Sequence, residues 1–448
     1  MQPIHTNVLI LGAGISGLTA ADSLSRSKID TIILEKESEV GGLARTIDFK
    51  GFKFDIGGHA LFIKNTKNNE YLKEIIEHNK LLTLKRRAKI LFNNKYLDYP
   101  ANISSVIGMD KKYSLRLFFD MFKLRKVGHQ DNFEKWIKAN YGDCLYRIYF
   151  KDYTEKVWGV SCDNLSADWA DKRIGENNLL NSFCSLFKCN VYCKEKRRSF
   201  YYFKDGIGLV SRMLKERVEK NKCKIYRNVS IGGFSTGNGK ICSLRFTCEG
   251  SDYEIFFKKV ISTIPIVELV NLFPPGNRET LKNVTEKIKY RSLILVNLIL
   301  SQPIVTEWYW SYFPSNEVIF SRIHEPKYWS RDMVIDQDKT MLSAEVFCDY
   351  DDSYWNMKDS EIISQTKRGL LSIGLVDERN FGDAIVYRVK YAYPLYYVGF
   401  KEPLNDAKSL FNKFNNLYLT GRNGTHSYFD MEDCIENSRT MISSLCGK

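Results

Sequence analysis

The chain has 448 residues, 44% of them hydrophobic and 13% aromatic, and carries a formal net charge of +13. This length and apolar content exclude a disordered chain and predict two or three domains with packed cores. The positive charge is compatible with nucleic acid, anionic lipid or a phosphorylated small molecule, but no stretch matches a nucleic-acid-binding module. We therefore expect no nucleic-acid partner, while a peripheral membrane contact or a diphosphate ligand stays open.

The cysteines and the apolar runs of the sequence indicate the cellular compartment in which the protein is expected. The cysteines number eleven, an odd count, and form no CxxC pair, which argues against a disulfide framework and a zinc ribbon, so we expect no metal site. The most apolar run, residues 293–300, is too short to span a bilayer. A strand-like segment begins a few residues from the N-terminus without a preceding signal peptide. The expected location is cytoplasmic.

The first predicted elements form a nucleotide-binding unit. NVLILGAGISGLTAADSL, residues 7–24, predicts an apolar strand, a turn with Gly12, Gly14 and Gly17, and a helix. Gly12 permits the tight turn, Gly14 lets the backbone approach a pyrophosphate, and Gly17 lets the helix pack closely on the strand. A second strand ends at Glu35, at the spacing where a carboxylate accepts hydrogen bonds from the adenosine ribose. The helix N-terminus is expected to face the anion.

A second glycine pair bears on the identity of the dinucleotide. EKESEVGGLART contains Gly41, Gly42 and Arg45, and it resembles the GGxxRT extension of the flavin-dependent amine oxidase superfamily. In that superfamily the glycines and the arginine lie along the FAD pyrophosphate. Gly58 and His59, in FDIGGHALF, occupy a place where such enzymes bring the backbone close to the isoalloxazine ring. The resemblance implies a tightly held FAD, with NAD(P)H only as a visiting reductant.

The remaining pattern predicts two further parts. Residues 101–200 are helical and charged, residues 222–265 return to short strands, and residues 280–390 contain several strand candidates. We expect an α/β fold with a Rossmann-type FAD-binding domain, an inserted helical domain and an antiparallel-sheet substrate domain. The expected boundaries are 1–100, 201–265 and 386–448 for the FAD-binding domain, 101–200 for the helical substrate-side domain, and 266–385 for the substrate domain.

A central motif makes the resemblance narrower. YTEKVWG, residues 153–159, resembles the YTEKxWG segment of UDP-galactopyranose mutases, and KYRSL, SRIHEPKYW, AYP and GRNGTHSYFDMED match that family in the same order. The resemblance implies a flavin-dependent isomerase that interconverts pyranose and furanose forms of a nucleotide-activated sugar through a reduced-flavin N5-sugar adduct, in polysaccharide biosynthesis. It also implies a nucleotide-sugar substrate and, as a family expectation, a homodimer.

The resemblance assigns substrate-site residues one by one. The positions that match catalytic and diphosphate-holding residues are Arg322, Tyr393, Arg422 and Tyr428. The positions that match other substrate contacts are Thr154, Trp158, Asn177 and Arg291, although Trp158 and Arg291 suit a structural support equally well. In the mutases, an arginine that contacts the diphosphate stands at the place of Asn177, and a histidine that faces the flavin stands at the place of Phe62. Both departures argue against UDP-galactose itself.

The C-terminal segment GRNGTHSYFDMED is expected to complete the flavin site. Gly421 frees the backbone to pass the flavin, and a helix is predicted to start near Asp430, with Met431 at its first turn and its N-terminus facing the flavin. Asp430 and Asp433 resemble an N-cap arrangement, which we favour over a catalytic role for either acid.

Two other functions stay open. A FAD-dependent amine oxidase or protoporphyrinogen oxidase-like oxidoreductase shares every cofactor motif of the N-terminal third, and a flavin-binding scaffold without turnover is a third alternative. YTEKVWG and GRNGTHSYFDMED favour a mutase-like pocket, whereas the missing arginine favours another ligand. The absence of a convincing catalytic triad or carboxylate pair in the sequence suits chemistry that a cofactor carries.

Overall fold

A largely parallel sheet surrounds the first strand. The computed structural model describes residues 2–63, 66–76, 80–99, 116, 120, 130–173 and 199–447. Its first sheet has seven strands in the order β10-β11-β12-β1-β2-β9, with β18 paired to β12. The pairings of β1 with β12 and β2, of β2 with β9, and of β12 with β18 are parallel, and β10 to β12 pair antiparallel. These strands are β1 (Gln2–Leu11), β2 (Thr31–Leu34), β9 (Lys224–Tyr226), β10 (Ser230–Gly237), β11 (Lys240–Cys248), β12 (Ser251–Ser262) and β18 (Leu417–Leu419).

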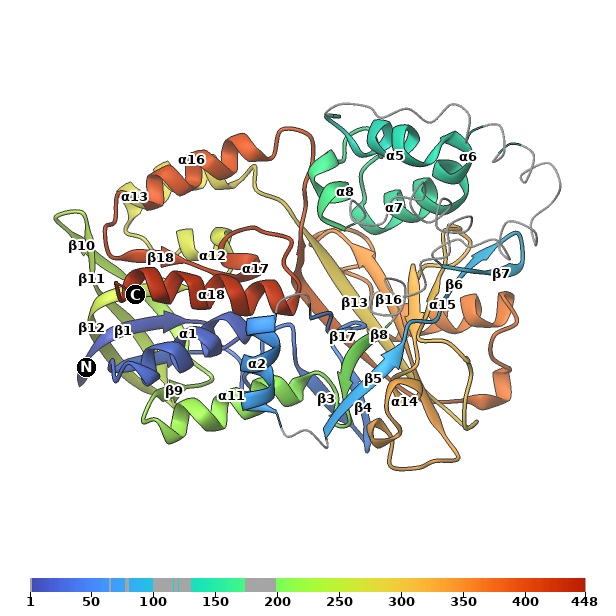
Figure 1. The fold of residues 1–448 in the computed structure, drawn as a ribbon, viewed down its shortest axis with the longest axis horizontal. Helices are drawn as coiled ribbons and strands as arrows, with labels where there is room; N and C mark the ends of the chain where they lie inside the picture. Colours follow the sequence, from blue (N-terminus) through green and yellow to red (C-terminus); the bar gives the residue numbers. More distant parts are fainter. Residues whose placement is uncertain are drawn as a thin grey trace.

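The second half of strand β1, residues 8–11, is buried on both faces, as expected for a central strand of a parallel sheet. Val8 and Ile10 pack into one core cluster with α1, α11 and α18, and Leu9 and Leu11 pack into another with α12, α13 and α16. The sheet is therefore the middle of three layers (Figure 1). The helices of these layers are α1 (Ile15–Arg26), α11 (Gly208–Lys220), α12 (Ile266–Val270), α13 (Pro275–Thr285), α16 (Lys401–Phe411) and α18 (Met431–Leu445).

A second seven-stranded sheet has the order β17-β13-β16-β15-β14-β6-β7. Its pairings are antiparallel except for the parallel pair of β14 and β6. One face is covered by α15 (Asp359–Ser372), and on the other face Leu293 and Leu295 pack against Ile56. The strands are β6 (Ala88–Phe92), β7 (Lys95–Asp98), β13 (Tyr290–Leu300), β14 (Trp310–Tyr312), β15 (Arg322–His324), β16 (Thr340–Cys348) and β17 (Phe381–Pro394).

A helical cluster lies above the second sheet in Figure 1. It comprises α5 (Phe133–Tyr141), α6 (Asp143–Leu145), a π-helical turn (Tyr146–Phe150), α7 (Lys151–Trp158) and α8 (Ala167–Arg173). Its core is rich in aromatic residues, with Phe133, Tyr146 and Trp158 all buried. Asn132 caps α5 by accepting a hydrogen bond from the Lys135 backbone N–H at 2.9 Å.

Short elements connect these parts. They are the hairpin β3 (Thr46–Phe49) and β4 (Phe52–Asp55), the pair β5 (Leu81–Lys85) and β8 (Ser199–Phe203), the helices α2 (Thr66–Ile75), α14 (Pro326–Trp329) and α17 (Gly421–Gly424), and the 3₁₀ turns Arg331–Met333 and Glu378–Asn380. No described helix has the length and apolar composition that a bilayer crossing needs.

The α/β fold class expected from the sequence is confirmed. The division into domains stays a prediction, and the sheet memberships bear on two of its edges. Strands β6 and β7 lie in the range 1–100 yet pair with the second sheet, and β17 runs without interruption across the boundary expected at 385/386. Pairing partners so far apart in the chain leave no local pattern in the sequence.

Candidate functional site

In the glycine turn after β1, the fold itself requires glycine at positions 12 and 17, whereas Gly14 leaves room beside α1. Gly12 has a φ of +96°, and a Cβ on Gly17 would lie 2.0 Å from the carbonyl oxygen of Gly12. A Cβ on Gly14 would meet nothing closer than the Cα of Gly42 at 3.9 Å. Gly14 is also the N-cap of α1 and offers no side-chain cap, so the first N–H groups of the helix have no capping side chain. An anionic ligand suits this place.

The second glycine pair and Arg45 continue this cradle. The Gly41 N–H donates to the carbonyl of Ala13 at 2.8 Å, which brings the two glycine loops together. Arg45 donates from Nε to the Gly42 carbonyl at 3.0 Å and from a terminal nitrogen to the Tyr387 hydroxyl at 2.6 Å. Backbone approach on two sides and a nearby guanidinium fit the pyrophosphate of a flavin dinucleotide.

Glu35 lies at the end of β2 and is buried. Its carboxylate accepts hydrogen bonds from the backbone N–H groups of Ala13 at 2.6 Å and Glu37 at 3.0 Å. The backbone therefore fixes the orientation of the carboxylate at the carboxyl edge of the sheet, where the sequence predicts the ribose contact.

The loop after β4 meets the second sheet. The Gly58 N–H donates to Oε1 of Glu345 at 3.2 Å, and His59 Nε2 lies 2.9 Å from the carbonyl oxygen of Ile56. Burial lowers the pKa of His59; the negative charge of Asp55 opposes this shift, and the positive charge of Arg422 adds to it. A largely neutral imidazole therefore lies within the electrostatic reach of a predicted substrate-site arginine.

Glu345 is the centre of a buried charge network that sequence reasoning missed. It lies on β16 opposite Arg322 of β15, whose guanidinium contacts Oε2 at 2.5 Å, and His324 Nδ1 lies 3.4 Å from Oε1. Burial alone raises the pKa of the Glu345 carboxyl, but Arg322 and His324 more than offset this and bring it to about 2. The sequence did contain a signal for this network, a lone acid in the apolar strand TMLSAEVFC. Such an acid is expected to be buried, and a buried carboxylate requires charged or hydrogen-bonding partners.

One N–H group of the Arg322 guanidinium, at its buried Nε, makes no hydrogen bond to the residues that the structure describes. Tyr153 and Tyr393 lie close enough to Arg322 to interact with it electrostatically. Tyr153 packs edge-on against Tyr312 with ring centroids 5.2 Å apart. Neither Tyr153 nor Tyr312 was assigned a role from the sequence, although Tyr153 opens the YTEKVWG motif.

The predicted residues Arg422, Tyr393 and Tyr428 come together. The two tyrosine rings are stacked, with centroids 5.7 Å apart and an interplanar angle of 19°. The Arg422 Cζ lies 5.3 Å from the Tyr393 centroid and 5.7 Å from the Tyr428 centroid. Trp158 is buried and its ring lies about 6 Å from both tyrosines, at 6.1 and 6.0 Å, so it backs the stack.

Of the other predicted substrate contacts, Arg291 lies opposite Tyr393 in the pairing of β13 with β17, and Thr154 lies one turn before Trp158 on α7. Arg291 is 3% exposed, donates from Nε to the Val157 carbonyl at 3.0 Å and pairs with Asp349 at 2.5 Å. This arrangement ties the end of α7 to the end of β16, as expected for a structural support. Thr154 is buried on α7. Asn177 lies outside the described residues.

The helix start and the cap predicted for the C-terminal segment are present in the structure. Helix α18 begins at Met431 with Asp430 as its N-cap, and Asp430 and Asp433 form a reciprocal capping box. The Asp430 N–H donates to Asp433 Oδ2 at 2.8 Å. Gly421 has a φ of +80°, and a Cβ there would lie 2.5 Å from Ser16 Oγ of α1. The two ends of the chain therefore meet at the glycine turn.

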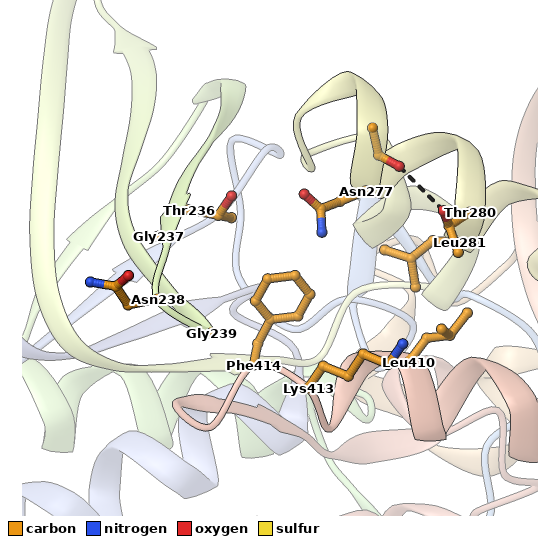
Figure 2. A pocket seen from close by; sticks show the side chains of 11 residues that line it. Thr236, Gly237, Asn238, Gly239, Asn277, Thr280, Leu281, Leu410, Lys413 and Phe414 are labelled. Carbon is orange, nitrogen blue, oxygen red and sulfur yellow. Dashed lines mark hydrogen bonds between the residues drawn. The ribbon is translucent and has the colours of Figure 1, made fainter.

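A separate surface pocket of about 340 Å³ lies between the β10–β11 turn, α13 and the end of α16. Figure 2 shows Thr236, Asn277, Leu281 and Phe414 around it, with Lys413 at its rim. The second sheet lies at the other end of the molecule (Figure 1), and none of the predicted site residues lines this pocket.

Comparisons with known proteins extend these observations. The family model described as "Flavin containing amine oxidoreductase" matches residues 15–440. The corticosteroid-binding protein of Candida albicans is 28% identical over 199 residues, which cover 39% of this chain and 40% of that protein. A Klebsiella pneumoniae protein named "Probable UDP-galactopyranose mutase" is 23% identical over 169 residues, 36% of this chain and 44% of that one. The chain thus matches less than half the length of either relative.

Solved structures share the fold over nearly the whole chain. A crystal structure of reduced UDP-galactopyranose mutase superposes with a TM-score of 0.82 at 19% identity and covers 99% of this chain and 94% of that chain. Putrescine oxidase bound to putrescine superposes with a TM-score of 0.64 at 14% identity and covers 100% of both chains. At these identities the likeness concerns the fold alone.

Proposed function

This chain belongs to the flavin-containing amine oxidoreductase family, and within that flavin-dependent family we propose that it is a mutase. The proposed reaction interconverts the pyranose and furanose forms of a nucleotide-activated sugar, with FAD in its reduced form as the cofactor. The observation that carries this proposal is the position of Arg422 over the stacked rings of Tyr393 and Tyr428.

The positive charge of Arg422 determines whether this part of the site attracts an anionic or a cationic ligand. Two stacked aromatic rings attract a cation by cation–π interaction, and here a guanidinium of the protein already takes that place. A cationic amine would meet a like charge, whereas a diphosphate would meet an attractive one. Arg322, whose Nε has no partner among the described residues, supplies a second guanidinium, and guanidinium groups bind phosphate oxygens with two parallel hydrogen bonds.

The residues of the chain would bind the substrate, orient it and neutralise the charge of its diphosphate. Arg322 and Arg422 would hold the diphosphate and offset its charge as it leaves the sugar, and the tyrosine hydroxyls would donate to it. Trp158 supports these rings, and Thr154 presents a hydroxyl from the same helix. A reduced flavin, when bound, supplies the nucleophile for the anomeric carbon. The proposed flavin contacts are Gly12, Gly14, Gly17, Glu35, Gly41, Gly42, Arg45, Gly58, His59, Gly421, Asp430 and Met431.

A second candidate is an oxidoreductase that transfers hydride from a small molecule to the flavin. The family as a whole and the fold shared with putrescine oxidase favour it. Arg422 would then favour an anionic substrate over an amine, because its positive charge remains in either case. NAD(P)H would serve the mutase only as an external reductant.

The test uses FAD-loaded protein that is reduced with dithionite under anaerobic conditions and offered a panel of nucleotide sugars. Conversion between pyranose and furanose forms is measured by anion-exchange chromatography. Arg422→Ala is expected to raise KM by roughly 100-fold, because it removes a charge-assisted contact worth about 2–3 kcal/mol, while flavin content stays unchanged. The matched control is Arg379→Ala, since Arg379 is 85% exposed.

One outcome contradicts the mutase, and another contradicts only the role of Arg422. The first is no conversion of any nucleotide sugar together with bleaching of the oxidised flavin by an amine or another reduced small molecule, which supports the oxidoreductase. The second is full conversion and an unchanged KM in Arg422→Ala, which removes Arg422 from the site.

A further inference from the structure

Lys156 ends in a ring of backbone carbonyl oxygens. Its Nζ donates to the carbonyls of Ser315 at 2.6 Å, Val318 at 2.7 Å, Phe320 at 2.8 Å and Phe313 at 3.2 Å. All four belong to the loop that joins β14 to β15. Among the described residues no carboxylate forms an ion pair with Lys156, so main-chain dipoles alone surround this cation.

These four carbonyls require a cation at their centre. Carbonyl oxygens that point at a common position repel one another, and a buried carbonyl without a donor costs free energy of folding. The ammonium of Lys156 has three N–H donors, so three of these carbonyls accept one each, and the more distant Phe313 carbonyl, at 3.2 Å, shares a donor in a bifurcated hydrogen bond. Burial lowers the pKa of Lys156 to about 7, and the carbonyl dipoles oppose that shift by favouring the charged form.

The carbonyl loop leads directly to the proposed substrate site. It is closed by a hydrogen bond from the Phe313 N–H to the Ser321 carbonyl at 2.9 Å, and the Ser321 N–H donates to the Glu345 carbonyl at 2.9 Å. The next residue is Arg322, and Tyr312 immediately precedes the loop. Helix α7, which carries Lys156, also carries Thr154 and Trp158. One cation therefore fixes the helical cluster against the two strands that present Arg322 and Tyr312.

We propose that Lys156 is a positioning residue whose ammonium holds the 313–320 loop in the shape that places Arg322 in the substrate site. The consequence for substrate affinity rests on the function proposed above; the shape of the loop does not. Since an ammonium ion is the group required, a small external alkylammonium ion is expected to replace the side chain once the side chain has been removed.

The first measurement reports on the loop alone. In FAD-loaded protein, Lys156→Met keeps most of the side-chain volume but removes the charge, and Lys156→Ala leaves a vacancy. Both are expected to speed hydrogen–deuterium exchange in the peptide covering residues 311–324 by at least about tenfold. The matched control is Lys151→Met, which removes an exposed lysine from the same helix and is expected to leave that exchange unchanged.

The second measurement is chemical rescue. Ethylammonium chloride is expected to restore slow exchange in Lys156→Ala but not in Lys156→Met, whose side chain fills the vacancy. Tetramethylammonium chloride at the same ionic strength has no N–H donor and is expected to restore neither. Binding of UDP, measured by calorimetry, is expected to weaken roughly 10- to 100-fold in Lys156→Met and to recover in Lys156→Ala with ethylammonium.

The outcomes separate this inference from the proposed function. If the wild-type protein does not bind UDP, the proposed substrate class fails, and the exchange and rescue data still decide the role of Lys156. If UDP affinity falls without a change in exchange, Lys156 acts on the ligand directly and the positioning role is wrong. Unchanged exchange in both variants also overturns it. If Lys156→Met does not fold, Lys156→Ala with and without ethylammonium provides the same test.

Discussion

The glycines in the turn after β1 lack side chains for different reasons. A Cβ on Gly17 would collide with the carbonyl oxygen of Gly12, so the fold itself requires glycine there. A Cβ on Gly14 would make only an ordinary van der Waals contact, with the Cα of Gly42 at 3.9 Å, and the φ of Gly14, −72°, suits any residue. The sequence motif assigns a ligand requirement to Gly14 and a packing requirement to Gly17, and the Cβ distances at the two positions are consistent with that assignment.

This difference predicts opposite behaviour for two alanine variants. Gly17→Ala is expected to lower the free energy of unfolding by about 3 kcal/mol, because helix α1 must move away from the turn. Gly14→Ala is expected to leave the apoprotein within about 1 kcal/mol of wild type while weakening FAD binding. Urea unfolding of the apoproteins and fluorescence titration with FAD measure the two quantities. Unchanged FAD affinity in Gly14→Ala would show that no pyrophosphate lies at Gly14.

Glu345 makes stability depend on acid pH. Its carboxyl has a pKa of about 2 in the folded protein, below the usual 4.5, so its contribution is present above pH 4.5 and is lost as the pH falls from 4.5 toward 2. Glu345→Gln is expected to cost about 3 kcal/mol at pH 6, because it leaves Arg322 buried without its counter-charge. The variant should also lose less stability than wild type between pH 5 and 3.

Urea unfolding at several pH values tests this expectation. The control is Glu378→Gln, at an exposed acid in a short 3₁₀ turn, which is expected to follow the wild-type curve. A Glu345→Gln curve parallel to that of wild type would show that the buried pair is not the source of the acid sensitivity. The sequence predicted Arg322 through a resemblance but not its partner, because the pairing follows from the register of β15 on β16.

At the scale of elements, the N-terminus of α18 is capped by Asp430 and Asp433. The side chain of each accepts a hydrogen bond from the backbone N–H of the other. The spacing of Asp430 and Asp433 predicted this cap, and the capping box confirms it. Local signals of this kind were sufficient wherever partners lie within a few residues, as at the turn after β1. Local signals did not predict the π-helical turn at Tyr146–Phe150. They also did not predict the parallel pairing of β14 with β6, because these two strands are more than two hundred residues apart in the chain.

The cap can be tested against a chemical role. Asp430→Ala is expected to lower the free energy of unfolding by about 1 kcal/mol, whereas Asp430→Asn retains the acceptor oxygen and should lie close to wild type. Both variants are expected to keep FAD and turnover. Thermal unfolding and steady-state rates provide the comparison. Loss of turnover in a stable Asp430→Asn variant would assign the carboxylate to the chemistry.

For the whole molecule, the flavin cradle and the second sheet are linked by Arg45 and Tyr387. The hydroxyl of Tyr387, on β17, accepts from Arg45 at 2.6 Å, and Gly58 donates to Glu345 across the same boundary. Because both contacts adjoin the cradle, FAD is expected to stabilise the two sheets together. The sequence located the cradle and suggested a second sheet, but the contacts between them depend on tertiary packing that no local pattern encodes.

This linkage predicts a single unfolding transition in the holoprotein. Free FAD at about 100 times its Kd is expected to raise the free energy of unfolding by about 2.7 kcal/mol, with flavin fluorescence and far-UV circular dichroism changing at the same urea concentration. Tyr387→Phe removes only the acceptor oxygen and is expected to reduce this gain, whereas Tyr350→Phe, at a 41% exposed ring, is expected to keep it. Early flavin release without a shift in the dichroism midpoint contradicts the linkage.

The pairing of β1 with β12 has a consequence for biosynthesis. The β1 strand leaves the ribosome well before its neighbour β12, which begins at Ser251, and before the adjoining β18, which begins at Leu417. At about 5–20 residues per second, the strand waits on the order of tens of seconds for its partners. During that time its apolar faces are open to other nascent chains and to chaperones. Translation speed and chaperone supply should therefore influence the yield of folded protein as strongly as the stability of the finished fold.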